Sequence, residues 1–318
     1  MKSEQKNEPK LISASRRTDI PRFYAGWFGE RRRQGFAESR TVFGVAGRVS
    51  LRRADVLGFL FWTRDAGPFM RELEALRVEG IPYAFQFTIN GYGRELEPRR
   101  PKLAEAIESF LAVSSSLRGP ESIQWRYDPI VVSDRYPATH HVRRFESIAR
   151  ELEGATRVVN VSFIEPYAKA LRRIADPGVQ YRAVDPRRHK SVARKHPDLP
   201  VVKEADSLLK ELSAAAREFG IELRVCCNPE YSGPLLGLPE RSQCIGPELF
   251  APYGDELLAR VSSFPEAPSR SACRCLKSHD IGMDETCASG CKYCYVTSSG
   301  RASLENFKRH DPKSPTLR

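Results

Sequence analysis

The chain has 318 residues, 41% of them hydrophobic, which is enough for the core of one large α/β barrel or of two ordinary domains. No apolar run approaches the roughly 18 residues that a membrane-spanning helix needs, and the polar segment 1–10 lacks the hydrophobic region of a secretory signal. We therefore expect a cytoplasmic protein without a membrane partner, in which a formal charge of +11 and eight cysteines require explanation.

Six segments have the apolar composition of buried strands, and helical patterns alternate with them. The expected strands are Lys10–Ser15, Val56–Trp62, Tyr83–Ile89, Ser122–Arg126, Val158–Ile164 and Ile221–Cys227. Apolar residues recur at helical spacing in Phe23–Gln34, Phe69–Val78, Lys102–Val113, His140–Leu152, Tyr167–Ile174 and Val202–Phe219. Strand–helix alternation favours a parallel sheet with helices outside. It predicts an α/β fold, a six-stranded (β/α) barrel or partial barrel over residues 1–230.

Two segments do not follow this alternation. Residues 177–200 are polar and basic, which indicates a long loop or an insertion. Residues 231–318 are rich in glycine and proline, and only Asp255–Val261 has a convincing helical pattern. We expect this cysteine-rich segment to pack on the mouth of the barrel, with a frayed tail after Gly300.

Polar or ionisable residues follow most of the expected strands. The C-terminal strand ends form the working face of α/β barrels, so arginine–aspartate pairs at three ends favour a charged site there. The alternative is that any strand leaving a core meets polar residues. The candidate catalytic residues are Arg16, Asp19, Arg64, Arg126 and Asp128. Arg17 and Asp65 are candidates for cofactor binding, because their charges suit a zwitterionic or anionic ligand.

Three cysteines with C-x3-C-x2-C spacing, Cys287, Cys291 and Cys294, form the most informative motif of the chain. Three thiols on a short loop cannot pair evenly as disulfides, and clustered cysteines in a reducing compartment are more often metal ligands. One possibility is a [4Fe–4S] cluster with one open iron. The other is tetrahedral zinc, with the fourth thiolate supplied from elsewhere in the chain. Gly290 would let this loop close tightly.

Five further cysteines, Cys226, Cys227, Cys244, Cys273 and Cys275, lie upstream of the loop. Adjacent strand residues face opposite sides of a sheet, so only one of the first two is expected to join the others. Four thiolates would complete a second site, either another [4Fe–4S] cluster or a structural zinc. They could also be buried thiols that act as small hydrophobic residues. Among the histidines, His279 beside Asp280 is the one most worth following.

The cysteine loop resembles that of radical S-adenosylmethionine (radical SAM) enzymes, and Tyr293 occupies the aromatic position before the last cysteine. That superfamily carries the loop after its first strand, whereas here it lies near the C-terminus. The later placement resembles the bacterial family called domain of unknown function 1848. Further likeness lies in 13–21, 61–63, 85–88 and 125–129, so the resemblance covers nearly the whole chain.

The resemblance implies a [4Fe–4S] cluster on the three-cysteine loop, S-adenosylmethionine as cofactor with Tyr293 beside it, and an electron-donor protein. It implies no particular substrate, and small molecules and nucleic acids both stay open. This chain has no glycine-rich G-G-E stretch, which radical SAM enzymes use to hold the methionine end of the cofactor.

Two other functions compete with radical chemistry. One is a metal-stapled nucleic-acid-binding protein, because a positive charge attracts polyanions. The arginine pairs are scattered and lack interleaved aromatic residues, so the competing explanation is a solvated surface. The other is a barrel enzyme whose clusters only transfer electrons. The densest basic patch comprises Arg187, Arg188, His189, Lys190, Arg194, Lys195 and His196.

Overall fold

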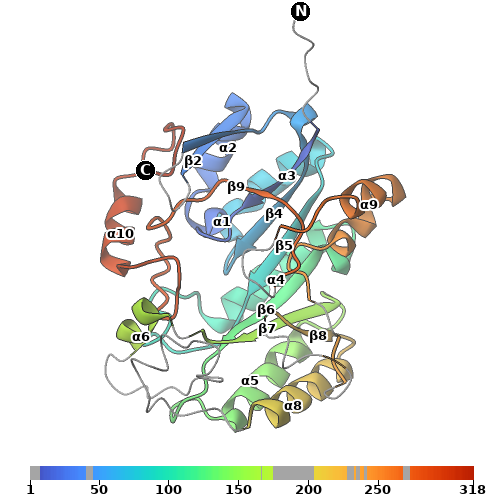
Figure 1. Ribbon diagram of the computed structural model, residues 1–318, viewed down its shortest axis with the longest axis vertical. Coiled ribbons are helices and arrows are strands. Elements are labelled where there is room, and N and C mark those ends of the chain that lie inside the picture. The colour runs from blue at the N-terminus through green and yellow to red at the C-terminus, as the bar shows by residue number, and fades with distance from the viewer. Residues whose placement is uncertain are drawn as a thin grey trace, which may run out of the picture.

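The computed structural model describes residues 8–40, 46–165, 167–174, 204–227, 233, 237–239, 242–267 and 273–318. Its centre is a seven-stranded sheet in the order β8-β7-β6-β5-β4-β1-β9, in which every neighbouring pair is parallel (Figure 1). The strands are β1 (Lys10–Ala14), β4 (Val56–Thr63), β5 (Tyr83–Thr88), β6 (Ile123–Ile130), β7 (Val158–Phe163), β8 (Glu222–Val225) and β9 (His279–Asp280). All six expected strands are therefore confirmed, and β9 is an addition.

The sheet is open within the described ranges, because its outer strands β8 and β9 do not pair with each other. A closed barrel, one of the two forms expected from the sequence, is therefore not found. A separate antiparallel hairpin, β2 (Phe36–Arg40) and β3 (Ala46–Ser50), was not expected.

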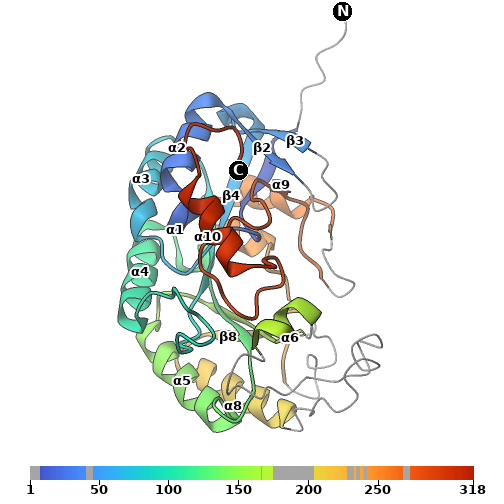
Figure 2. The same ribbon diagram turned by 90° about the vertical axis from the view of Figure 1, so that its left-hand side faces the viewer.

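The described α-helices are α1 (Ile20–Phe23), α2 (Ala25–Gln34), α3 (Met70–Val78), α4 (Leu103–Ser116), α5 (Ala138–Glu151), α6 (Ala168–Ile174), α8 (Ala205–Glu218), α9 (Asp255–Ser262) and α10 (Gly300–Lys308). Short 3-10 turns occur at η1 (Arg53–Asp55), η2 (Gly67–Phe69), η3 (Pro120–Ser122) and η7 (Pro247–Tyr253). Helices α2, α3, α4, α5 and α8 form an arc along the outer side of the sheet (Figure 2). None of the described helices is long and apolar enough to cross a membrane.

The two faces of the sheet differ in chemistry because successive strand residues point to opposite sides. Phe59, Phe61 and Phe85 lie in the apolar core on the helix side. The opposite, inner face is apolar near the strand starts, where Leu60 packs in one cluster with Phe250 of η7. Toward the strand ends the inner face becomes polar and carries the buried residues Gln86, Gln124, Arg126, Asn160 and Ser162.

The C-terminal segment covers this inner face and joins the sheet through β9. Asp280 of β9 holds the join with five contacts, from Ser13 Oγ and Ser15 Oγ at 2.7 Å, Gly282 N at 2.9 Å, Arg16 N at 3.0 Å and Arg17 Nε at 3.2 Å. These hydrogen bonds tie β9 to β1 and to the residues that follow it.

The tail after Gly300 is ordered, so the expectation of fraying is wrong. Helix α10 places Phe307 against Phe23 and Tyr24, and the carbonyl of Ser314 accepts a hydrogen bond from Trp27 Nε1 at 2.9 Å. Aromatic contacts and a backbone hydrogen bond hold the tail in place, and its polar composition does not indicate them. The basic segment 177–200, with the patch around Arg187, lies outside the described residues.

A buried histidine makes the stability of the sheet dependent on pH. His141 of α5 is completely buried; its Nδ1 accepts from Tyr127 Oη at 2.8 Å, and Nε2 contacts the Val131 carbonyl at 3.2 Å. Burial lowers the pKa of His141 from 6.5 to about 4. The folded state therefore holds the neutral ring, and its stabilising contribution is present above pH 6.5 and lost as the pH falls toward 4.

We expect the free energy of unfolding to fall by up to about 3 kcal/mol over this window because of His141. His141→Gln should flatten the slope while lowering stability at neutral pH. Denaturant titration at several pH values measures both effects, and His140→Gln, at a half-buried position, is the control. A wild-type slope that survives in His141→Gln would contradict the assignment.

Candidate functional site

A pocket of about 250 Å³ opens at the carboxyl ends of the parallel strands, and all eight cysteines line it. Seven of the eight charged or aromatic site residues expected from the sequence also line this pocket, namely Arg16, Arg17, Asp19, Arg64, Arg126, Asp128 and Tyr293. The exception is Asp65, which accepts a hydrogen bond from Gly67 N at 2.9 Å and lies 3.8 Å from Arg22.

The three-cysteine loop is shaped so that its sulfurs are accessible to a ligand within the pocket. Gly290 has a φ of +69°, and a Cβ at this position would meet the guanidinium of Arg99 at 2.3 Å. A side chain there would be strained and would collide with Arg99, which also donates to the carbonyl of Ala288. The positive φ therefore favours glycine here, in agreement with the expected tight loop, and a Cβ would also displace the end of the Arg99 side chain.

Backbone amides donate to two of the three loop sulfurs. The N–H groups of Asp19 and Ser289 bond to Cys287, and Thr297 N lies 3.5 Å from the sulfur of Cys294. Burial raises the pKa of Cys287, and it raises the pKa of Cys291 to about 12. Burial thus favours the protonated thiols as long as no metal ion is bound, and binding of a metal ion would displace the protons.

A buried network connects the loop to the strand ends. Arg64 Nη1 lies 2.9 Å from Glu97 Oε1, and the hydroxyl of Tyr293 contacts both residues. Asn90 adds a bond from its Nδ2 to the Tyr293 hydroxyl at 3.1 Å. Burial acts to lower the pKa of Arg64, but the charges of Glu97 and Tyr293 outweigh it and hold that pKa well above its usual value. Tyr293 therefore anchors the loop through a buried ion pair.

Asp19 connects β1, β4 and the cysteine loop. Its carboxylate accepts from Thr63 Oγ1 at 2.7 Å and from Arg64 N at 3.1 Å, while its own N–H bonds to Cys287. Burial raises the pKa of Asp19 to about 6. Asp19 thus contacts the loop through its backbone N–H, while its carboxylate ties this position to the end of β4.

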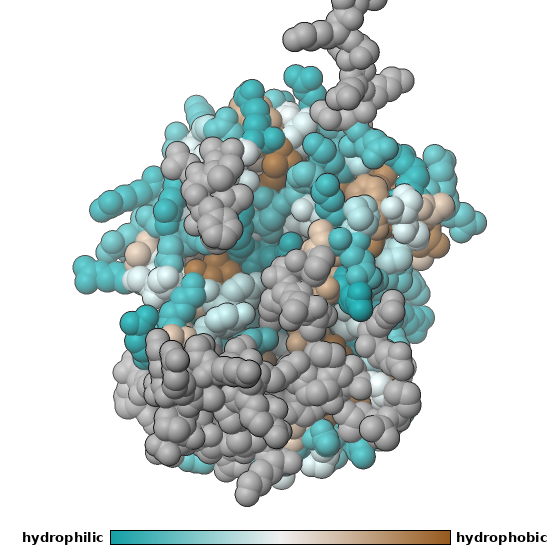
Figure 3. All heavy atoms as spheres, in the orientation of Figure 1, coloured by the Kyte–Doolittle hydropathy of each residue, from teal (hydrophilic) through white to brown (hydrophobic). Residues whose placement is uncertain are grey.

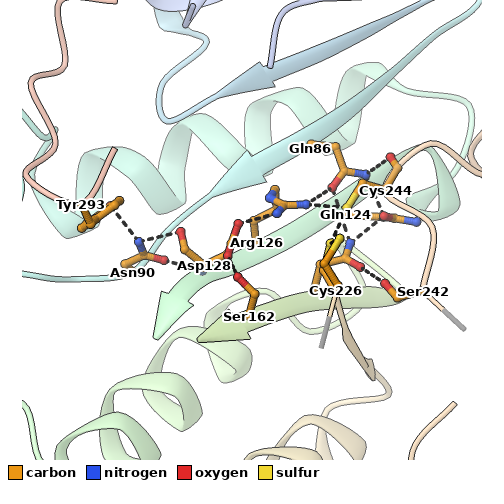
Figure 4. A network of polar contacts seen from close by, with 12 residues as sticks. Gln86, Asn90, Gln124, Arg126, Asp128, Ser162, Cys226, Ser242, Cys244 and Tyr293 are labelled. Atoms are coloured by element: carbon orange, nitrogen blue, oxygen red, sulfur yellow. Dashed lines mark hydrogen bonds and ion pairs between the residues drawn. The ribbon is translucent and has the colours of Figure 1, made fainter. Parts of the chain in front are cut away.

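The inner-face polar network continues along the sheet to the upstream cysteines (Figure 4). Arg126 pairs with Asp128, which also bonds to Ser162. The Nη1 of Arg126 donates to the sulfur of Cys244 at 2.9 Å. Hydrogen bonds from Cys226 and Cys275 lower the pKa of Cys244, and Arg126 adds to the effect. This arrangement favours a thiolate at Cys244.

Among the upstream cysteines, the sulfurs of Cys226 and Cys244 lie 3.3 Å apart. That only one of Cys226 and Cys227 joins the other cysteines stays a prediction, but its premise, that these two side chains face opposite sides, is corrected. The sulfurs of these two residues lie 3.7 Å apart, and both line the pocket. Strand β8 ends at Val225, and Cys227 has a φ of +58°. The alternation of a strand no longer applies after this turn, so neighbouring side chains can face the same side.

No metal-binding group is preformed: the described ranges contain no set of three or more His, Cys, Asp or Glu side chains that could hold an ion. The ligand roles of the eight cysteines therefore stay predictions. His279 lies in β9 and is not among the residues that line the pocket.

Two residues central to this site escaped sequence reasoning. Glu97 is only 2% exposed and lies between β5 and α4, where no strand or helix period marks it. In the sequence, the only indication of Glu97 is that this acidic residue stands directly before the segment Pro98–Pro101. Asp280 was noticed only as a neighbour of His279, although it is the residue that holds β9 to β1.

Ion pairs with carboxylates neutralise part of the positive charge of the chain. In α2, Arg32 pairs with Glu79 at 2.5 Å and Arg33 with Glu30 at 2.7 Å. The described part of the face in Figure 3 is largely hydrophilic, with apolar patches near α9. For the α2 cluster, these contacts favour the interpretation as a solvated, ion-paired surface.

Arg173 of α6 holds the cysteine loop from outside the pocket. Its guanidinium donates to the carbonyls of Lys292, Cys294 and Thr297. We expect Arg173→Gln to lower the free energy of unfolding by about 1–3 kcal/mol and to speed amide hydrogen exchange in 292–297. Arg172→Gln, at an exposed position on the same helix, is the matched control. Equal exchange in the two variants would rule out this clamp.

Comparisons with known proteins complete the description. Two solved structures share low overall similarity with the chain. Mannonate dehydratase from Streptococcus suis serotype 2 is 13% identical with a TM-score of 0.33, over 62% of this chain and 59% of that chain. A putative alpha-L-fucosidase from Bacteroides thetaiotaomicron VPI-5482 is 9% identical with a TM-score of 0.31, over 80% and 68%.

The chain thus spans 59% of the length of the dehydratase, and neither similarity supports an inference about function. No curated protein matches the sequence. The family model described as "Domain of unknown function (DUF1848)" matches residues 11–296. This match runs from β1 through all three cysteines of the loop, so the chain belongs to the DUF1848 family.

Proposed function

We propose that this protein is an iron–sulfur enzyme of the radical SAM type, with Cys287, Cys291 and Cys294 as ligands of a [4Fe–4S] cluster. The observation that carries the proposal is that this loop shares one pocket with Arg16, Arg126 and the other charged residues of the strand ends. A cluster there would face ionisable groups that could bind a charged cofactor and substrate.

The donor set suits such a cluster. Three sulfurs on one loop leave one of four irons without a protein ligand, and N–H bonds to cysteine sulfur are among the features that set cluster potentials. No hydrogen bond connects any two of these three sulfurs within the described ranges, unlike the upstream thiols. When bound, the cluster would supply the electron that cleaves a carbon–sulfur bond of S-adenosylmethionine.

The fold is also compatible with this proposal. The seven-stranded parallel sheet has helices on its outer side and a pocket at the carboxyl ends of its strands, and we interpret the open sheet as a radical-SAM-like partial barrel. The segment after residue 230 then contributes the cysteine loop to the mouth. The proposal implies an electron-donor protein as a partner, because the cluster would have to be reduced again after it gives up an electron.

The residues of the pocket have separable roles in this proposal. Tyr293 and Asp19 hold the loop in place, as described above. Ser289 has a buried hydroxyl without a hydrogen-bond partner in the described ranges, so this group is available to a ligand. The Arg16 side chain likewise makes no hydrogen bond or ion pair there, although its backbone N–H bonds to Asp280. Arg16 is therefore suited to an anionic group of the cofactor.

We expect anaerobically reconstituted, reduced protein to convert S-adenosylmethionine to 5′-deoxyadenosine and methionine. Replacing Cys287, Cys291 or Cys294 by Ala should abolish turnover and lower the iron content by about one cluster, because each ligand is required. Chromatography of the products and iron–sulfide analysis measure both effects. Cofactor loss equal to a protein-free blank, with the cluster intact, would show that the proposed function is wrong.

Arg16→Gln should weaken binding of S-adenosylmethionine about ten- to hundredfold without changing the iron content, because a hydrogen bond to a charged group is lost. Equilibrium binding without reductant measures the dissociation constant. Arg52→Gln, at an exposed position before η1, should bind normally. An unchanged constant in Arg16→Gln would remove this residue from the cofactor site.

A further inference from the structure

A second cysteine group, consisting of Cys226, Cys244, Cys273 and Cys275, lines the same pocket and is separate from the loop in sequence. Its side chains are only 4–6% exposed. The sulfurs of Cys226 and Cys244 lie 3.3 Å apart (Figure 4), Cys244 is hydrogen-bonded to Cys275, and Cys275 to Cys273. Four buried thiols are thus connected in one chain of contacts.

We propose that the second cysteine group binds one mononuclear, tetrahedral divalent metal ion, zinc or iron. Zinc–thiolate bonds of about 2.3 Å in a tetrahedron place neighbouring sulfurs about 3.8 Å apart. The measured separation of 3.3 Å between Cys226 and Cys244 is close to this value. A four-iron cluster would require wider spacing, because its own atoms stand between the cysteine ligands.

The backbone already holds the segments that would supply the ligands. Cys226 N bonds to the Val161 carbonyl at 2.8 Å, directly after β8. The carbonyl of Cys244 accepts from Gln86 Nε2 at 2.8 Å. Leu276 N bonds to the Ile245 carbonyl at 3.0 Å, which connects the neighbours of Cys244 and Cys275. Metal binding then requires mainly side-chain rotation, with loss of the thiol protons.

A charged hydrogen-bond donor already faces this group. Arg126 donates to the sulfur of Cys244 at 2.9 Å, and a hydrogen bond from a guanidinium stabilises a thiolate ligand. The neighbouring Asp128 binds the other side of the same guanidinium and fixes its orientation. Arg126 is thus a positioning residue for the second cysteine group.

This inference does not depend on the proposed function, because the two ligand sets have no cysteine in common. Purified full-length protein should contain cluster iron and sulfide in equal numbers plus about one further zinc or iron per chain. Cys244→Ser should lose the additional ion and keep its sulfide. Cys291→Ser should lose the cluster and keep the additional ion. Cys227→Ser is the matched control and should resemble the wild type.

Cobalt substitution provides a test that does not rely on a folded Cys244 variant. Cys291→Ser protein loaded with Co²⁺ should show the visible bands of a tetrahedral thiolate site. Sulfide for two clusters in the wild type, an unchanged metal content in Cys244→Ser, or loss of the additional ion in Cys227→Ser would overturn the assignment. A Cys226–Cys244 disulfide in anaerobically alkylated protein would do the same. Loss of cofactor cleavage alone, with the additional ion retained, would count against the proposed function only.

Discussion

The inner face of the sheet imposes the strongest constraint on this structure, because buried polar side chains there must find partners. Gln86, Gln124 and Asn160 bond to one another across β5, β6 and β7, with N–O distances of 2.7 Å for two of these contacts. A buried donor or acceptor without a partner costs about 1–3 kcal/mol. The C-terminal segment completes the network through the Cys244 carbonyl and Ser242 Oγ. These hydrogen bonds therefore help to fix the position of Cys244.

The same constraint explains why buried arginines are retained around the pocket. Arg64 and Arg126 are each held by a carboxylate, Glu97 and Asp128 respectively. A buried cation without such a partner would destabilise the fold by several kcal/mol. Each arginine also donates to a residue of the cysteine regions, Arg64 to the hydroxyl of Tyr293 and Arg126 to the sulfur of Cys244. Arg64, Arg126 and Asp128 thus stabilise the fold and also line the candidate site.

The amino-acid sequence predicted the repeating elements well because burial imposes a period on them. All six expected strands exist, and the arginine–aspartate ends converge because parallel strands terminate at one edge. Glu97, β9 and the ordered tail show no such period, because contacts with residues distant in the sequence hold them in place. Likewise, the positive φ at Cys227 is a property of a turn that strand alternation cannot anticipate. Local patterns thus specify the sheet, and contacts across the chain specify the pocket.

The pairing of β9 with β1 has a consequence for how the protein is made. Ser13 and Asp280 are separated by 267 positions, so the edge of the sheet is completed only after the chain has been synthesised through β9. Domains usually begin to fold from the N-terminal side as the chain emerges. All eight cysteines lie after residue 225 and arrive when the preceding strands already exist. Strands β1 to β8 of the scaffold therefore precede every thiol in the order of synthesis.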